Sequence, residues 1–114
     1  MKTTTTTAAS LPPAVTGYVE AANRFDAGAA AGHFAADATV HDESHTYVGG
    51  GEIRAWIAAT SRKYRPAFTV MRSAVNCDSV SLAIAVAGEF PGSPVTLDFE
   101  FQLRDGKIST LDIT

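Results

Sequence analysis

The clearest pattern in the chain is an alternation of apolar and polar residues in its C-terminal half. Between Val95 and Arg104 every odd-numbered residue is apolar and every even-numbered residue is polar or charged. Successive side chains of a β-strand point to opposite faces, so this period of two predicts a strand with one buried and one wet face. Similar runs predict three further strands at residues 67–75, 80–90 and 107–113.

Short segments rich in turn-forming residues separate these four strands, at residues 76–79, 91–94 and 105–106. The last is Asp-Gly, a strong signal for a two-residue hairpin. Connections this short allow only antiparallel neighbours, so the strands are predicted to form a meander. The apolar residues of the final strand change phase between Ile108 and Leu111, which predicts a β-bulge.

Upstream of the strands, apolar residues recur every three or four positions, which predicts helices at residues 12–24, 27–34 and 52–65. Asp26 is placed to cap the second helix, and Pro66 ends the third. The stripe on the first helix comprises Val15, Tyr18, Val19 and Ala22. The stripe on the third comprises Ile53, Trp56, Ile57 and Thr60.

Three N-terminal helices followed by a curved antiparallel sheet predict an α+β fold. The helices must cover the apolar face of the sheet, and where they fail to close over it we expect a cone-shaped internal pocket. Residues 11–114 are predicted to form this single domain, since 114 residues is a typical domain length. Residues 1–10 are rich in threonine and are predicted to be a disordered tail.

Composition narrows the possible partners. A net charge of −3 with nine Lys and Arg argues against nucleic acid, which requires a concentrated basic face. The chain has no run of about 18 apolar residues and no signal-peptide pattern, so neither membrane insertion nor secretion is expected and the cytoplasm is the expected location. The single cysteine, Cys77, excludes an internal disulfide.

The chemistry-bearing residues gather in the stretch 36–57. A short β-like run at Thr39 and Val40 leads into the polar cluster His41, Asp42, Glu43 and His45, followed by three glycines and the helix that carries Trp56. Ionisable groups beside apolar strand residues are where burial and neighbouring charge shift a pKa. Because alternate strand residues share a face, we expect Asp42 to join Val40 at the wall of the pocket, with His41 and Glu43 pointing away.

The same cluster, extended by His33, contains residue types that bind zinc or iron. The spacing is not the fixed spacing that a helix gives to paired histidine ligands, so we favour a hydrogen-bonded loop and expect no metal. His33 is interpreted as a surface residue at the end of the second helix.

The order of elements, together with the segments HFAADATVHD at residues 33–42 and RDGKI at residues 104–108, resembles the nuclear transport factor two-like superfamily. The likeness is to its SnoaL-like and ketosteroid-isomerase-like branch and extends over roughly residues 12–113. It implies a cystatin-like roll, chemistry without a cofactor, and a homodimer formed through the sheet. The superfamily hosts isomerases, cyclases, dehydratases, hydrolases and binding modules, so the resemblance does not fix the reaction.

Two residues match functional positions of the ketosteroid isomerase pattern. Asp42 matches the general base and Tyr18 matches the tyrosine that donates to the enolate oxygen. The second donor of that family, a protonated aspartate, is matched by Phe99. Losing one such donor typically costs about a hundred- to a thousand-fold in rate, so steroid isomerisation is not expected.

The remaining expectations concern the ligand and the use of the pocket. Aromatic and apolar residues near Asp42 are core by default and are also candidates for contact with a small hydrophobic ligand. These candidates are Phe34, Val40, His45, Trp56, Phe68, Phe99 and Phe101. Three hypotheses stay open: an isomerase, cyclase or hydrolase with Asp42 as acid and base; a non-catalytic binding module; and a homodimeric interaction domain that uses the Ala-rich face of strand 80–90.

Overall fold

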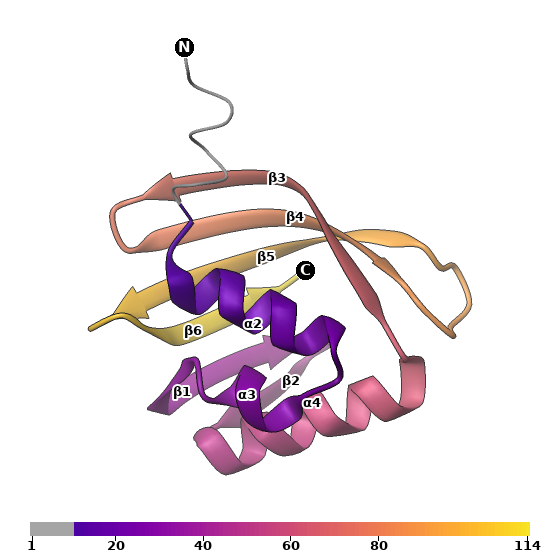
Figure 1. Ribbon diagram of the computed structural model, residues 1–114, viewed down its shortest axis with the longest axis horizontal. Coiled ribbons are helices and arrows are strands. Elements are labelled where there is room, and N and C mark those ends of the chain that lie inside the picture. Colours follow the sequence, from indigo (N-terminus) through magenta and orange to yellow (C-terminus); the bar gives the residue numbers. More distant parts are fainter. Residues whose placement is uncertain (1–10) are drawn as a thin grey trace.

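A computed structural model of the protein describes residues 11–114 (Figure 1). The predicted tail at residues 1–10 lies outside these described residues. The described helices are α2 (Pro13–Asn23), α3 (Ala27–Ala31) and α4 (Gly50–Tyr64). The strands are β1 (Phe34–Asp42), β2 (His45–Val48), β3 (Ala67–Asn76), β4 (Ser79–Ala87), β5 (Val95–Arg104) and β6 (Lys107–Ile113).

All six strands belong to one sheet in the order β2-β1-β6-β5-β4-β3. The four C-terminal strands form the predicted antiparallel meander. Strand β1 joins this meander by pairing parallel to β6, and β2 folds back against β1 as an antiparallel edge strand. The C-terminal strand β6 therefore lies inside the sheet, between β1 and β5.

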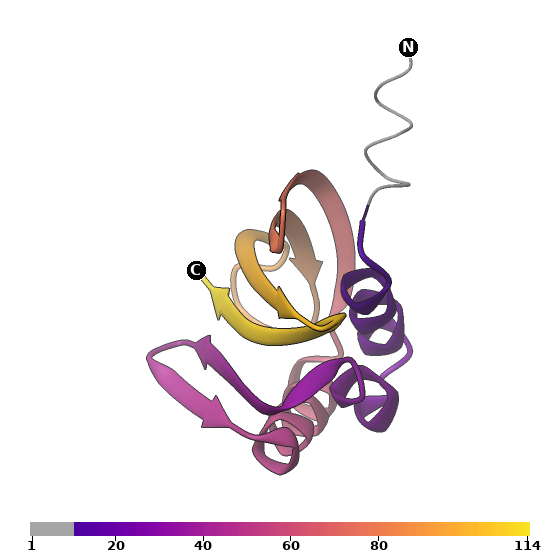
Figure 2. The same ribbon diagram turned by 90° about the vertical axis from the view of Figure 1, so that its left-hand side faces the viewer.

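The sheet curls strongly, and the helices lie on one side of it (Figure 2). Helix α2 packs against β3 and β6, α4 packs against β1 and β2, and α3 contacts both α2 and α4. This arrangement confirms the expected α+β fold, in which helices cover the concave face of a curved sheet. The predicted alternation is also confirmed, since Val80, Leu82, Ile84 and Val86 of β4 are buried.

Local details of the sequence explain several element ends. The Asp26 carboxylate accepts a hydrogen bond from the backbone N–H of Ala29 at 3.0 Å, so it caps α3 as predicted. The β-bulge in β6 is confirmed at Ser109, where the register with β5 shifts and the Ser109 hydroxyl donates to the Gln102 carbonyl at 2.9 Å. Asp105 and Gly106 both have positive φ, as the two-residue hairpin requires.

The predicted end of the second helix was wrong. The second helix ends at Ala31 and not at Phe34, because β1 already begins at Phe34 and runs for nine residues. His33 therefore lies in the turn between them, half-buried beneath α2. A Cβ added at Gly17 would lie 2.4 Å from the His33 ring, so the close approach of this ring requires a glycine there.

The polar segment after Asp42 was predicted to be a loop, and it is a hairpin. Strand β2 pairs with β1 in the register Asp42↔His45 to Thr39↔Val48. The two turn residues, Glu43 and Ser44, have φ of 52° and 68°. This conformation is the one that Asn-Gly usually supplies, so the sequence lacked the ordinary hairpin signal.

Within residues 11–114 no helix has the length and apolar character needed to cross a bilayer.

Candidate active site

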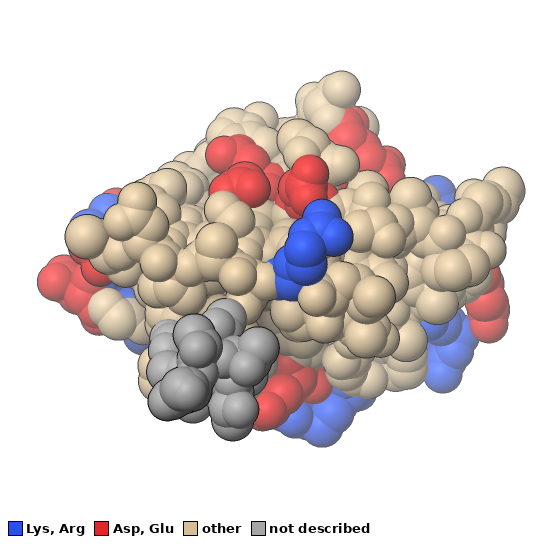
Figure 3. All heavy atoms as spheres, turned by 90° about the horizontal axis from the view of Figure 1, so that it is seen from above, with Lys and Arg blue, Asp and Glu red and all other residues tan. Residues whose placement is uncertain are grey.

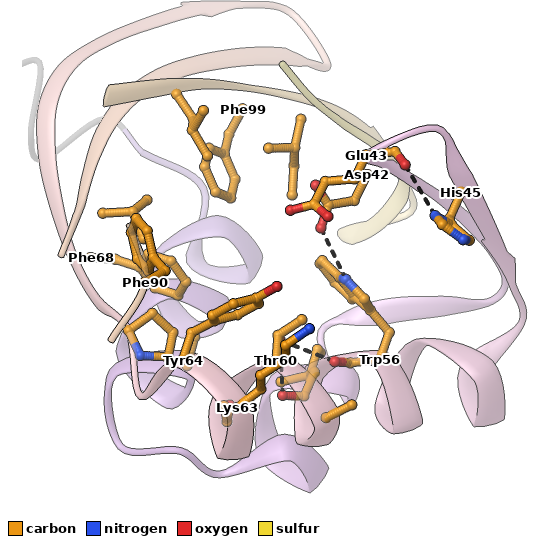
Figure 4. Close-up of a pocket in the computed structure, with 18 of the residues that line it drawn as sticks. Asp42, Glu43, His45, Trp56, Thr60, Lys63, Tyr64, Phe68, Phe90 and Phe99 are labelled. Carbon is orange, nitrogen blue, oxygen red and sulfur yellow. Dashed lines mark hydrogen bonds between the residues drawn. The ribbon is translucent and has the colours of Figure 1, made fainter. Parts of the chain in front are cut away.

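A cavity of about 920 Å³ lies between the curled sheet and the helices. Its apolar wall comes mainly from β3, β4, β5 and the segment after β4, through residues such as Phe68, Val86, Phe90 and Phe99. Its polar wall comes from the β1–β2 hairpin and from α4 (Figure 4). The volume lies at the upper end of the range typical for pockets that hold small organic ligands.

Asp42 is the last residue of β1 and stands half-buried in this wall. One of its carboxylate oxygens, Oδ2, accepts a hydrogen bond from the indole N–H of Trp56 at 3.1 Å (Figure 4). Burial raises the pKa of the Asp42 carboxyl above its ordinary value, and the charge of Glu43 adds to the rise. The hydrogen bond from Trp56 and the proximity of His45 pull the pKa in the opposite direction.

Tyr18 reaches the same cavity from α2. Its ring is 2% exposed and meets Phe34 and Phe101 edge-on, with ring centroids 5.4 Å and 6.0 Å away. Within residues 11–114 the hydroxyl has no hydrogen-bond partner and is not sealed from the cavity. Burial first, and the charge of Asp42 second, raise the pKa of Tyr18, so the phenol stays protonated.

A stack of rings borders the mouth of the cavity beside Asp42. The Tyr47 ring lies between His45 and Trp56, with centroid distances of 6.3 Å and 5.6 Å. His45 and Tyr47 occupy alternate positions of β2 and therefore share a face. Tyr47 was not among the predicted site residues, because a four-residue edge strand is too short for its alternation to be recognised.

The structure sorts the predicted ligand contacts into two groups. His45, Trp56, Phe68 and Phe99 line the cavity. Phe34, Val40 and Phe101 do not line it, which corrects the prediction: all three are buried in the core. Phe34 and Phe101 pack around the ring of Tyr18, so they hold this side chain in place and have no surface left for a ligand.

The residues of the polar cluster also lie on different sides of the hairpin relative to the cavity. His41 points away from the cavity as predicted, with its Nδ1 3.0 Å from the Thr46 hydroxyl and its Nε2 3.8 Å from the Asp112 carboxylate. Glu43, predicted to point away, lines the mouth, because the positive φ at the turn breaks the strand alternation. In the part of the chain that the structure describes, no three His, Cys, Asp or Glu side chains come close enough to hold a metal ion.

Sequence reasoning missed the second half of the polar wall. Glu52, Thr60, Lys63 and Tyr64 of α4 all line the cavity. Their spacing along the helix was visible in the sequence, but charged residues in the last turn of a helix are ordinarily solvated, so Lys63 and Tyr64 gave no signal of a site. Phe90, predicted as the end of a strand, lies after β4 and faces the cavity from there.

Comparison with known proteins agrees with the fold. Residues 15–111 match the profile of the SnoaL-like domain. A crystal structure described as a "putative polyketide cyclase" from Sinorhizobium meliloti is 35% identical, with a TM-score of 0.89 over 93% of this chain and 97% of that chain. None of the curated proteins matches the chain.

Two more distant crystal structures share the fold. A protein with a ketosteroid isomerase-like fold from Catenulispora acidiphila, in complex with trimethylamine, is 22% identical with a TM-score of 0.81, over 92% of this chain and 86% of that chain. An uncharacterised cystatin-fold protein from Novosphingobium aromaticivorans is 13% identical with a TM-score of 0.75, over 89% and 94%. The predicted superfamily and its cystatin-like roll are confirmed.

Proposed function

Since this chain belongs to the SnoaL-like family, we propose that its cavity takes up a small, largely apolar molecule and that Asp42 moves a proton on it without a cofactor. One observation carries the proposal. The carboxylate of Asp42 stands half-buried in the polar wall of a mostly apolar cavity, where burial raises its pKa and makes it a stronger base than an exposed aspartate. The Trp56 N–H holds one carboxylate oxygen and leaves the other to meet the substrate.

Tyr18 supplies the complementary group. Its protonated hydroxyl, which has no partner among residues 11–114, opens to the cavity that Asp42 lines, so it can donate to an oxygen that becomes negative when a proton is removed from carbon. The apolar side chain of Phe99 occupies the position that matches the second donor of ketosteroid isomerases, and it contributes no hydrogen bond. With one donor, the site suits carbon acids that are already acidic, such as a carbon between two carbonyl groups.

Proton removal from such a carbon begins both double-bond isomerisation and aldol-type ring closure. The similarity to the Sinorhizobium meliloti structure supports the cyclase type among these reactions. In either reaction Asp42 accepts the proton from carbon and returns it after the electrons have rearranged, so the carboxylate is regenerated.

The test is proton exchange at carbon, which can be measured before the natural substrate is identified. We expect the protein to catalyse hydrogen–deuterium exchange at the central carbon of 1,3-dicarbonyl compounds in deuterated buffer, followed by proton NMR. The variant Asp42→Asn keeps the shape and should lower the exchange rate by about a hundred- to ten-thousand-fold, with an unchanged circular dichroism spectrum. Asp112→Asn removes a carboxylate from the outer face of β6 and serves as the control, because Asp112 contacts His41 and not the cavity. Exchange that survives Asp42→Asn would contradict the proposal.

The second candidate function is ligand binding without chemistry, and the absence of a second donor at Phe99 favours it. In that case the protein would bind apolar ligands with equal affinity before and after Asp42→Asn and would catalyse no exchange. Affinity and exchange measured on the same variant therefore separate the two functions.

A further inference from the structure

The cavity has a second polar region that proton transfer at Asp42 does not use. The first region, at the β1–β2 hairpin, contains the carboxylates of Asp42 and Glu43, with Glu52 of α4 beside it. The second lies at the last turn of α4 and contains Lys63 and Tyr64. Among the residues that line the cavity, Lys63 is the single lysine or arginine in the described part of the chain. The wall is therefore acidic at one end and basic at the other.

Contacts with the segment after β4 position Tyr64 at the basic end, and the exposed Lys63 side chain lies against its ring. The Lys63 ammonium lies over the face of the Tyr64 ring, 5.1 Å from its centroid. The edge-to-face contact with Phe90, at a centroid distance of 5.8 Å, supports the same ring from another direction. The backbone carbonyl of Tyr64 accepts a hydrogen bond from the N–H of Glu89 at 2.7 Å, which ties the end of α4 to the segment after β4. Figure 4 shows Lys63 and Tyr64 both extending into the cavity from α4.

Neither polar group has a protein partner within residues 11–114. The ion pairs found there join His41 to Asp112 and Arg104 to Asp37, and Lys63 is not among them. The nearest candidate on its own helix, Glu52, accepts a hydrogen bond from the backbone N–H of Val48 at 2.8 Å, at the opposite end of α4. The Tyr64 hydroxyl likewise has no hydrogen-bond partner in this range. An ammonium and a hydroxyl donor thus face the cavity with no acceptor from the protein.

We infer that Lys63 and Tyr64 bind the carboxylate of the ligand, so that the substrate is an amphipathic carboxylic acid. This inference rests on the proposed function of the cavity and deepens it. The ammonium pairs with one carboxylate oxygen and the Tyr64 hydroxyl donates to the other. The apolar body of the acid then lies along Phe68, Phe90 and Phe99.

The charge distribution also sets the direction in which the acid enters. A carboxylate at the other end would face the carboxylates of Asp42, Glu43 and Glu52, and like charges repel one another. With the acid group at α4, the part of the ligand that carries the reacting carbon is directed towards Asp42 and Tyr18. Lys63 and Tyr64 are therefore residues of specificity and orientation.

The experiment compares an acid with its neutral ester. Calorimetry measures the affinity of 1-adamantanecarboxylate and of its methyl ester at neutral pH and low salt, and the fluorescence of Trp56, the single tryptophan of the chain, reports binding in the cavity. Lys63→Met keeps the apolar stem and removes the charge, and Tyr64→Phe removes the hydroxyl alone. Arg62→Met is the matched control. Arg62 is the neighbouring residue of α4 and does not line the cavity, and its substitution by Met removes the same charge.

We expect wild-type protein to bind the acid about fivefold to tenfold more tightly than the ester, as a charge-assisted hydrogen-bonded pair allows. Lys63→Met should abolish this preference, because the affinity for the acid should fall to that for the ester. Tyr64→Phe should reduce it by about threefold, and Arg62→Met should leave it intact.

Three other outcomes would overturn the inference. Equal affinity of wild-type protein for acid and ester would show that the basic end does not recognise a carboxylate, while binding of both would leave the proposed function in place. An equal loss of preference in Arg62→Met would assign the effect to net charge. If neither compound binds, the cavity is not a binding site for apolar molecules, and the proposed function fails together with the inference.

Discussion

Asp42 illustrates how opposed local influences set the chemistry of one residue. Burial in the cavity wall raises the pKa of its carboxyl, and the hydrogen bond from the Trp56 indole lowers it. The first effect outweighs the second, because the carboxylate has lost part of its hydration and one neutral donor replaces only a part of it. Trp56 therefore both orients the carboxylate and limits how basic it becomes.

This balance predicts a shift in pH dependence. Trp56→Phe removes the N–H donor that stabilises the ionised form, so the pKa of Asp42 should rise further, and the acidic limb of the pH–rate profile should move to higher pH. The Asp42 carboxyl can also be followed directly by ¹³C NMR titration. Tyr47→Phe is the control, since Tyr47 stacks on Trp56 and no hydrogen bond joins it to Asp42. A midpoint that stays in place or moves to lower pH in Trp56→Phe would contradict this account.

At the scale of elements, the β1–β2 hairpin positions site residues at the cost of a strained turn. It places Asp42, Glu43, His45 and Tyr47 around the mouth of the cavity, and its turn requires positive φ at both Glu43 and Ser44. Residues with a Cβ adopt this conformation at a cost of roughly 1–2 kcal/mol each. The pairing of β1 with β6 and the packing of α4 on β2 hold the turn in place.

Relief of this strain should stabilise the protein. Ser44→Gly removes the Cβ at φ 68° and should raise the free energy of unfolding by about 1 kcal/mol, measured by urea denaturation. Ser44 is exposed, so no packing is lost. The control is Ser73→Gly in β3, where φ is not positive, and this substitution should lower the free energy of unfolding. Ser93→Gly does not serve as a control, because the Ser93 hydroxyl accepts a hydrogen bond from the Gly88 N–H at 2.9 Å. A destabilised Ser44→Gly would show that the turn is not strained.

At the scale of the whole molecule, the described helices leave the outer face of the sheet uncovered (Figure 2). The residues of β4 that alternate with its core residues are small: Ala87 is exposed, Ser81 and Ala85 are half-buried, and Ala83 is buried between its neighbours. Figure 3 shows one face of the molecule, on which most side chains are uncharged and acidic side chains gather beside a basic one. A surface of small side chains lets another sheet approach closely, which supports the homodimer that the resemblance implies.

We therefore expect sedimentation velocity to give twice the monomer mass at micromolar concentration. Ala85→Arg places a long charged side chain on the outer face of β4 and should produce a monomer with an unchanged circular dichroism spectrum. Ala36→Arg adds the same charge at an exposed position of β1, which is separated from β4 in the sheet by β6 and β5, and should remain dimeric. Wild-type protein that sediments as a monomer at high concentration would exclude this assembly.

The sequence by itself determined the features that depend on neighbours along the chain. The period of two fixed the four meander strands, the period of three to four fixed α2 and α4, and local turn chemistry fixed the Asp26 cap and the Asp105–Gly106 hairpin. It also placed Asp42 on the same face as Val40, because alternation within a strand is a local property.

Only the tertiary structure decided which side chains border the cavity. Val40, Phe34 and Phe101 are as apolar as Phe68 and Phe99, yet the first three are sealed in the core and the last two line the cavity. The same holds for Lys63 and Tyr64, which a helix end alone would leave in solvent. Whether a side chain meets the core, the cavity or water depends on how the sheet curls and on which distant element covers it, and no local pattern encodes that relationship.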